Sequence, residues 1–209
     1  MVQKKNYYKW HSKYYYGILD EVKPFLATKS VLDLGCGIGW FGEVLKEFNP
    51  SIRVTNIDND LTGYTNPDNP PILLEGNKLP FLDDTFDGVV AKAVIEHLWE
   101  PLIFFKEFYR VIKLGGIVFI SVPDSRCKTF WNDYTHIRPF TKKSLTSLLE
   151  DGGFSIQRIY YMSSFPDLGL FAFLPNYFKK YSSVPKIAQI MGTIGVGSST
   201  INCMAIKKC

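Results

Sequence analysis

Short apolar runs alternate along the chain with longer segments in which apolar residues recur every three or four positions. Runs of about four to eight residues are typical of buried strands, and the longer spacing is typical of helices with one buried face. Strands are predicted at seven places: 30–34, 52–57, 71–74, 86–91, 117–122, 154–161 and 200–206. Helices are predicted at 13–26, 40–48, 101–112 and 142–149, with Pro24 interrupting the first and Thr141 capping the last.

This alternation predicts an α/β fold: a doubly wound, Rossmann-like sheet of seven mostly parallel strands with helices on both faces. The 209 residues suit a single domain. Residues 1–29 are expected to form an N-terminal helical cap, and residues 163–197 an apolar insert before the last strand. Ligands of such sheets bind beyond the carboxyl ends of the strands. Functional residues should therefore lie in the segments that follow each strand.

Composition narrows the class of protein. Hydrophobic residues make up 46% of the chain, which is enough for a buried core. The net charge is only +4, and the lysine pairs are scattered along the chain. The chain therefore lacks the clustered basic stripe that is typical of a nucleic-acid-binding protein. The four cysteines contain no C-x-x-C pair, and the N-terminus lacks the apolar core of a signal peptide, so we expect a cytoplasmic protein. The longest apolar run, 168–174, is too short for a transmembrane segment.

A glycine-rich turn follows the first predicted strand. Gly35, Gly37 and Gly39 allow a tight turn and a close approach of the backbone to a ligand. Asp33 precedes the turn, where a carboxylate suits an amino group or a sulfonium better than a phosphate. Asp58 ends the second strand and can accept both hydroxyl hydrogens of an adenosine ribose. The turn and this acid fit both a nicotinamide dinucleotide and S-adenosylmethionine.

Five motifs in register then resemble those of class I S-adenosylmethionine-dependent methyltransferases. The segment 31–39 (VLDLGCGIG) is similar to their first motif, and 56–58 (NID) to their second. The segments 75–81 (EGNKLPF), 93–98 (AVIEHL) and 108–116 (FYRVIKLGG) follow in the family's order. The resemblance covers residues 30–124, and in this family the last strand of the sheet is antiparallel.

The resemblance implies a role for each motif. The glycine turn would hold the methionine part of S-adenosylmethionine, and of its product S-adenosylhomocysteine. Asp58 would bind the ribose, residues 75–78 would line the adenine, and 91–93 would form the floor. Two residues depart from the family pattern: Glu75 replaces the usual Asp, and Leu114 the usual Pro. The expected cofactor-binding residues are Asp33, Gly35, Cys36, Gly37, Gly39, Asp58, Asn59, Glu75, Gly76, Asn77, Ala91, Lys92 and Ala93.

The acceptor is expected after strands four and five. The segment 131–141 (WNDYTHIRPFT) resembles one found in methyltransferases that often act on sugars, glycans or related small molecules. His136 is a candidate general base, because its pKa lies near neutrality, and His97 a candidate beside the transferred methyl. Equally, His136 and Arg138 can organise the loop, and His97 can serve in packing or capping. Three histidines without clustered carboxylates predict no metal site. The expected substrate-binding residues are Trp131, Tyr134, Arg138 and Tyr15.

Two segments leave alternatives open. Aromatic residues crowd positions 7–16, which suits either a lid over cofactor and acceptor or a helix packed on the sheet edge. The apolar insert suits an acceptor pocket, a partner surface, peripheral contact with a membrane, or packing on its own core.

Together these features predict a methyltransferase that acts on a small-molecule or saccharide acceptor, at oxygen. The alternatives are a nicotinamide-dependent oxidoreductase, disfavoured by Trp40 after the turn, and a non-catalytic scaffold that keeps the cofactor fold.

Overall fold

The computed structural model describes residues 21–64, 66–164, 190, 193 and 198–208. Its strands are β1 (Ser30–Leu34), β2 (Arg53–Asp58), β3 (Ile72–Leu73), β4 (Phe86–Lys92), β5 (Ile112–Pro123), β6 (Phe154–Ser164) and β7 (Ser198–Lys207). Its helices are α3 (Trp40–Phe48), α4 (Pro101–Val111), α5 (Lys128–Trp131) and α6 (Lys142–Asp151), with short 3-10 turns η1 (Lys23–Phe25) and η2 (Ile95–His97).

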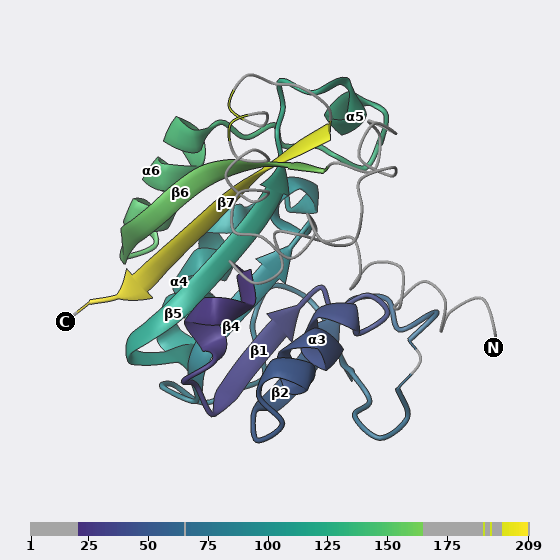
Figure 1. The fold of residues 1–209 in the computed structure, drawn as a ribbon, viewed down its shortest axis with the longest axis vertical. Helices are drawn as coiled ribbons and strands as arrows, with labels where there is room; N and C mark the ends of the chain where they lie inside the picture. Colours follow the sequence, from purple (N-terminus) through teal and green to yellow (C-terminus); the bar gives the residue numbers. More distant parts are fainter. Residues whose placement is uncertain (1–20, 65, 165–189, 191–192, 194–197, 209) are drawn as a thin grey trace, which may run out of the picture.

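The seven strands form one sheet in the order β3-β2-β1-β4-β5-β7-β6 (Figure 1). The first five pair in parallel, and β7 runs antiparallel between β5 and β6. The predicted class is therefore confirmed, including the antiparallel last strand. Strand order reverses between β1 and β4, so their carboxyl ends border a crevice where such folds bind ligands.

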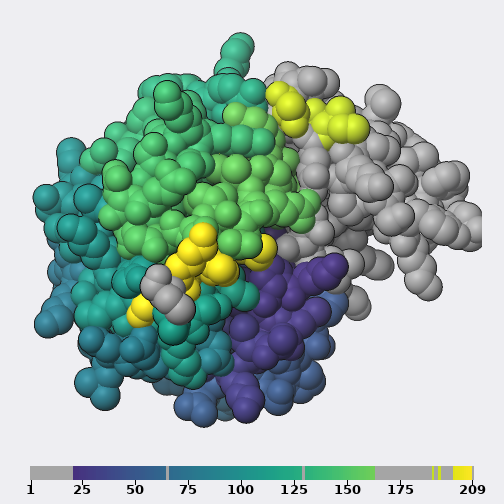
Figure 2. Space-filling model, turned by 90° about the vertical axis from the view of Figure 1, so that its left-hand side faces the viewer, coloured from purple at the N-terminus to yellow at the C-terminus, as the bar shows by residue number. Residues whose placement is uncertain are grey.

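Helices cover both faces of the sheet. Figure 1 shows α3 in front of β1 and β2, with α4 on the opposite face. The α3 face packs Phe41, Val44 and Leu45 with Phe25 of η1. The other face forms the larger core, in which α4 contributes three phenylalanines and α6 contributes Leu145 and Leu149. Figure 2 views the molecule from the side, with the green atoms of α6 and β6 above the yellow end of β7.

Most predicted boundaries hold within one or two residues, and α3 matches its prediction. β5 is the largest difference: it begins at Ile112, five residues before the predicted start, because α4 passes directly into the strand. Gly115, with a φ of 74°, lies within that extension. Thr141 caps α6 as expected, in a capping box with Ser144.

Parts of two predicted segments lie outside the described residues. Of the helix predicted at 13–26, only residues from 21 on are described, and they pass into η1, which has Pro24 in its first turn. β6 extends to Ser164, and most of the predicted insert 163–197 lies beyond the described residues. Among the described residues, no helix combines the length and apolarity that crossing a membrane requires.

Candidate functional site

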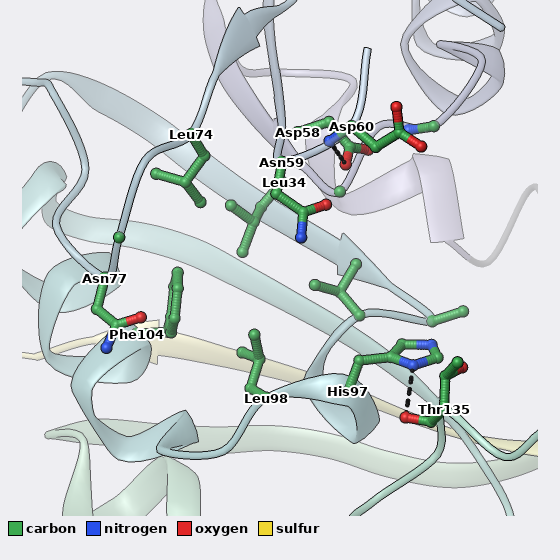
Figure 3. Close-up of a pocket in the computed structure, with 15 residues that line it drawn as sticks. Leu34, Asp58, Asn59, Asp60, Leu74, Asn77, His97, Leu98, Phe104 and Thr135 are labelled. Atoms are coloured by element: carbon green, nitrogen blue, oxygen red, sulfur yellow. Dashed lines mark hydrogen bonds between the residues drawn. The ribbon is translucent and has the colours of Figure 1, made fainter. Parts of the chain in front are cut away.

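A cavity of about 750 Å³ lies at the carboxyl ends of β1, β2 and β4. In Figure 3, Asn77 and Phe104 lie at one end, and His97 with Thr135 at the other. The lining residues are Leu34, Gly35, Gly37, Asp58, Asn59, Asp60, Leu74, Gly76, Asn77, Ala93, Val94, His97, Leu98, Phe104 and Thr135. Seven of the thirteen predicted cofactor-binding residues are among them: Gly35, Gly37, Asp58, Asn59, Gly76, Asn77 and Ala93.

The wall formed by Gly35, Gly37 and Asp58 is here called the glycine side. Gly35 and Gly37 have φ values of 66° and 52°, in the left-handed region that favours glycine. A Cβ built on Gly37 meets no heavy atom within 4 Å, so it would project into open space. Asp58 Oδ2 accepts a hydrogen bond from the Gly37 amide at 2.7 Å, which ties the turn to the end of β2.

The charge beside the glycine side is negative. Asp58 and Asp60 both line the cavity, and none of the described residues in its lining is a lysine or arginine. Hydrogen bonds from Thr62 to the Asp60 carboxylate lower the pKa of Asp60, so this acid is ionised at neutral pH. Because like charges repel, this environment favours a cationic ligand over a pyrophosphate.

At the far end of the cavity, β3 is followed by Leu74, Gly76 and Asn77. The Leu74 amide donates to Asp58 O at 2.7 Å, which continues the pairing of β2 with β3. Gly76 has a φ of 74°, and a Cβ there also meets nothing within 4 Å. Phe104 from α4 lies across from Asn77 (Figure 3). An apolar ring beside an amide and exposed backbone suits a planar heterocycle such as adenine.

The opposite wall contains His97, and Glu96 and His136 lie next to it outside the lining; these three residues are here called the histidine side. His97 lines the cavity and belongs to η2. The His136 ring lies behind it, with a centroid separation of 4.9 Å. The two candidate catalytic histidines are thus brought together from positions 39 residues apart. Glu96 is fully buried, and burial raises its pKa to about 7.

Six predicted cofactor-binding residues lie outside the lining. Glu75 is exposed and Ala91 is packed in the core. Lys92 donates from Nζ to Glu21 and lies over the Trp40 and Phe41 rings. A Cβ on Gly39 would contact Tyr64 instead of the cavity.

The remaining two, Asp33 and Cys36, lie close to the turn and are buried. Burial raises the pKa of Asp33 to about 7, despite the opposing effect of Lys92. Burial also raises the pKa of the Cys36 thiol to about 12, so this cysteine is protonated at neutral pH.

Three of the predicted substrate-binding residues, Trp131, Tyr134 and Arg138, also lie outside the cavity lining. Trp131 and Tyr134 are 65% and 94% exposed. Arg138 donates from Nε to Leu98 O at 3.3 Å and from Nη2 to Trp99 O, so its guanidinium holds the loop after η2. Tyr15 falls outside the described residues. Binding of an acceptor by these four side chains stays a prediction.

Sequence reasoning did not select Leu34, Asp60, Leu74, Val94, Leu98, Phe104 or Thr135, which also line the cavity. Leu34 and Leu74 end or follow strands, so their positions carried a signal. Phe104 is one of the buried residues of α4. Its place in the lining depends on how α4 packs across the sheet.

The geometry fits S-adenosylmethionine. Gly37 and Gly76, where an added Cβ would meet no heavy atom within 4 Å, lie on different segments of one cavity. Asp58 retains acceptor capacity beside them for ribose hydroxyls, since a carboxylate has about four lone-pair sites. The neighbouring acids match a cationic sulfonium and ammonium.

A family model described as a methyltransferase domain matches residues 10–159. The chain belongs to this methyltransferase family. A probable S-adenosylmethionine-dependent methyltransferase of Mycolicibacterium smegmatis is 30% identical over 138 residues, covering 63% of this chain and 54% of the relative. A malonyl-[acyl-carrier protein] O-methyltransferase of Legionella pneumophila is 24% identical over 82% of this chain and 61% of its own.

Solved structures show the same fold. A SAM-dependent methyltransferase from Archaeoglobus fulgidus superimposes with a TM-score of 0.69 at 21% identity, covering 96% of this chain and 99% of its own. The methyltransferase fold therefore accounts for the described domain. The chain spans about half the length of the mycobacterial relative.

Proposed function

We propose that this protein is an S-adenosylmethionine-dependent methyltransferase that methylates an oxygen of a small-molecule or saccharide acceptor. The observation that carries the proposal is the single cavity bounded by the glycine turn, Asp58 and Gly76–Asn77. When bound, S-adenosylmethionine supplies a methyl group on a sulfonium, which passes to the acceptor oxygen as the hydroxyl proton is lost and S-adenosylhomocysteine forms.

Each wall has a distinct task in this proposal. Gly35 and Gly37 let the backbone reach the methionine part, Asp58 binds the ribose hydroxyls, and Asn77 with Phe104 encloses the adenine. These contacts would fix the cofactor and thereby align the transferred group, which is the main requirement for an in-line displacement.

The acceptor is proposed to enter on the histidine side. His97 lines the cavity there, opposite the acids of the glycine side, and Val94 and Leu98 provide apolar walls. The predicted sugar-related segment 131–141 supplies Thr135 to this wall. An O-methyltransferase among the relatives agrees with oxygen as the target. A small molecule suits the cavity because the wall is concave and combines polar with apolar groups.

Ligand-induced thermal stabilisation tests the cofactor assignment. S-adenosylhomocysteine at about 100 times its Kd should raise Tm by about 5–10 °C, whereas NADH at the same concentration should not. Equal stabilisation by NADH, or none by S-adenosylhomocysteine, would contradict the proposal. Acceptor candidates, free saccharides first, are then screened for a mass increase of one methyl group.

A pair of glycine variants locates the binding site. Gly37→Ala places a methyl group in the cavity and should weaken S-adenosylhomocysteine binding at least tenfold. Gly115→Ala is the matched control, because Gly115 also has positive φ and free space around an added Cβ but lies outside the cavity lining. Both variants carry similar backbone strain, so only cavity occupancy separates them. Equal affinities in calorimetric titrations would place the ligand elsewhere.

A further inference from the structure

Three potential ligand atoms converge on the histidine side of the cavity. Glu96 Oε1 lies 4.0 Å from His97 Nε2 and 4.0 Å from His136 Nε2. One ligand atom from each of the three side chains can be chosen so that all lie within 4.8 Å of one another. Glu96 and His97 come from η2, whereas His136 comes from the segment after α5. The linear order of these residues, with His136 39 positions after His97, gives no sign of this convergence, and no metal site is predicted from it.

The hydrogen bonds of both rings fix which nitrogen faces Glu96 with a lone pair. His97 Nδ1 lies 3.0 Å from Thr135 O, and His136 Nδ1 lies 2.8 Å from Phe130 O. A carbonyl oxygen only accepts, so each Nδ1 must carry the hydrogen. In the neutral rings, both Nε2 atoms therefore present lone pairs. Metal-ligating histidines share this arrangement, in which the second ring nitrogen donates to a backbone carbonyl.

The Glu96 carboxylate lacks a hydrogen-bond partner within the described part of the chain. Its side chain has no exposed surface, and neither oxygen has a hydrogen-bond partner. No lysine or arginine among the described residues forms an ion pair with it. A buried carboxylate without a partner is costly, so something that supplies positive charge should stabilise it. At 4.0 Å, the two imidazoles are too distant for direct hydrogen bonds.

The surroundings add negative charge. Asp133 Oδ2 lies 3.7 Å from His136 Nε2, on the same side as Glu96. Asp133 Oδ1 is already bound by the amide and hydroxyl of Thr135, which holds the aspartate in place. The Glu96 carboxylate and two imidazole lone pairs form a donor set for a divalent cation, and Asp133 adds negative charge beside it.

We propose that Glu96, His97 and His136 bind one divalent transition-metal ion at the edge of the cofactor cavity. Two imidazole nitrogens and a carboxylate suit Zn²⁺, Mn²⁺ or Fe²⁺ better than Mg²⁺ or Ca²⁺. Ligand distances of about 2.0–2.2 Å place neighbouring ligand atoms roughly 3 Å apart, so the three side chains need to close by about an ångström. Three protein ligands leave coordination positions free for other donors.

The ion has a function that rests on the proposed methyl transfer. Because His97 lines the cavity, an ion bound to it borders the space proposed for the acceptor. A metal ion there would hold an acceptor hydroxyl and lower its pKa, which favours the nucleophilic oxygen. This role replaces the general-base role predicted for His136, since a lone pair given to a metal does not accept a proton.

Metal retention tests the site without any need for turnover. The chelator-stripped protein is dialysed against Zn²⁺ or Mn²⁺ and analysed by plasma mass spectrometry. We expect about one ion per chain, and Co²⁺ should produce visible absorption bands typical of nitrogen and oxygen ligands. Retention near zero for every metal would overturn the inference and would leave a shared proton as the partner of Glu96.

Matched variants locate the ion. Glu96→Gln keeps the shape of the side chain and should weaken metal binding at least tenfold, whereas Glu150→Gln makes the same change at an exposed glutamate on α6 and should not. His97→Gln provides a second variant should Glu96→Gln fail to fold. Unchanged metal affinity in these variants would overturn the site.

Titration with S-adenosylhomocysteine separates the two proposals. The Glu96→Gln variant should keep its affinity for this compound, because Glu96 is absent from the cavity lining. If the wild-type protein binds S-adenosylhomocysteine but no metal ion, the metal site is rejected and the proposed function is not. Failure of the wild-type protein to bind S-adenosylhomocysteine would reject the proposed function, while a retained ion would still establish the metal site.

Discussion

The glycine side and the histidine side of the cavity are built in different ways. On the glycine side, backbone groups from the segments after β1 and β2 form the wall, and Asp58 fixes them by accepting the Gly37 amide. On the histidine side, the functional groups are side chains of Glu96, His97 and His136. On the glycine side, ligand binding therefore depends on backbone that no glycine side chain covers. On the histidine side, it depends on the side chains themselves.

The two sides also differ in how they are held. The glycine turn is a local structure between consecutive elements. The histidine side needs a distant segment to dock, which it does through the Ile137 and Arg138 amides, both 3.1 Å from Glu96 O. Substitutions on the glycine side should thus disturb folding and cofactor binding together. Substitutions on the histidine side should weaken metal binding and leave cofactor affinity unchanged.

The largest effect is expected from Gly35→Ala. A Cβ at this position would overlap Val94 Cγ2, and its φ of 66° adds strain. We expect a loss of about 3 kcal/mol in the free energy of unfolding, from overpacking and the left-handed backbone together. Denaturant titration measures it. Adding Val94→Ala should restore part of the loss, and a fully stable Gly35→Ala protein would show that this turn tolerates side chains.

Asp33 gives the glycine side a pH dependence of stability. Its pKa is about 7 in the folded protein, against 3.8 ordinarily, so folding favours the protonated carboxyl. Stability contributed by that proton is fully present below about pH 4 and is lost as the pH rises through 7. Relative to Asp33→Asn, the wild type should therefore lose stability, by at most a few kcal/mol, between pH 4 and 7 and remain level above. A difference that stays constant from pH 4 to 8, measured by denaturant titration, would contradict this.

A smaller effect is expected from Asp58→Asn. The amide keeps one acceptor oxygen for Gly37 but loses the charge and an acceptor for the ribose hydroxyls. S-adenosylhomocysteine should bind about 10–100-fold more weakly in calorimetry, which corresponds to about 1.4–2.8 kcal/mol. Asp68→Asn serves as the control, because Asp68 is exposed and lies outside the cavity lining. An equal loss of S-adenosylhomocysteine affinity in both variants would contradict the assignment of Asp58 to the ribose.

The smallest effect is expected from a substitution outside both sides of the cavity, which serves as a control for global destabilisation. Thr141→Ala removes the cap of α6 and should lower stability by about 1 kcal/mol. Thr141→Ser should retain the cap, and affinity for S-adenosylhomocysteine should be unchanged in both. Should the alanine variant also lose ligand affinity, global destabilisation would have to be considered for the other variants as well.

Much of the glycine side was predictable because its parts follow strands directly. Gly35, Gly37 and Asp58 were predicted from their positions at or after the ends of strands, whereas Gly76 and Asn77 at the far end of the cavity were predicted from the family resemblance alone. The family motifs predicted too many cofactor-binding residues in strand β4, where successive side chains point to opposite faces of the sheet. Ala91 and Lys92 end β4, but one packs in the core and the other reaches Glu21. A resemblance gives positions along the chain, not the direction of each side chain.

The sequence by itself determined which segments along the chain form strands and helices, and where the glycine turn and Asp58 lie. Hydrophobic periodicity and the need for positive φ are local properties, so they can be identified in the sequence. Only the tertiary structure decided that His136 lies beside His97 and that Glu96 is buried next to both, with no hydrogen-bond partner among the described residues. That arrangement depends on the docking of residues 133–138 against η2, a contact across about 40 positions that no local pattern encodes.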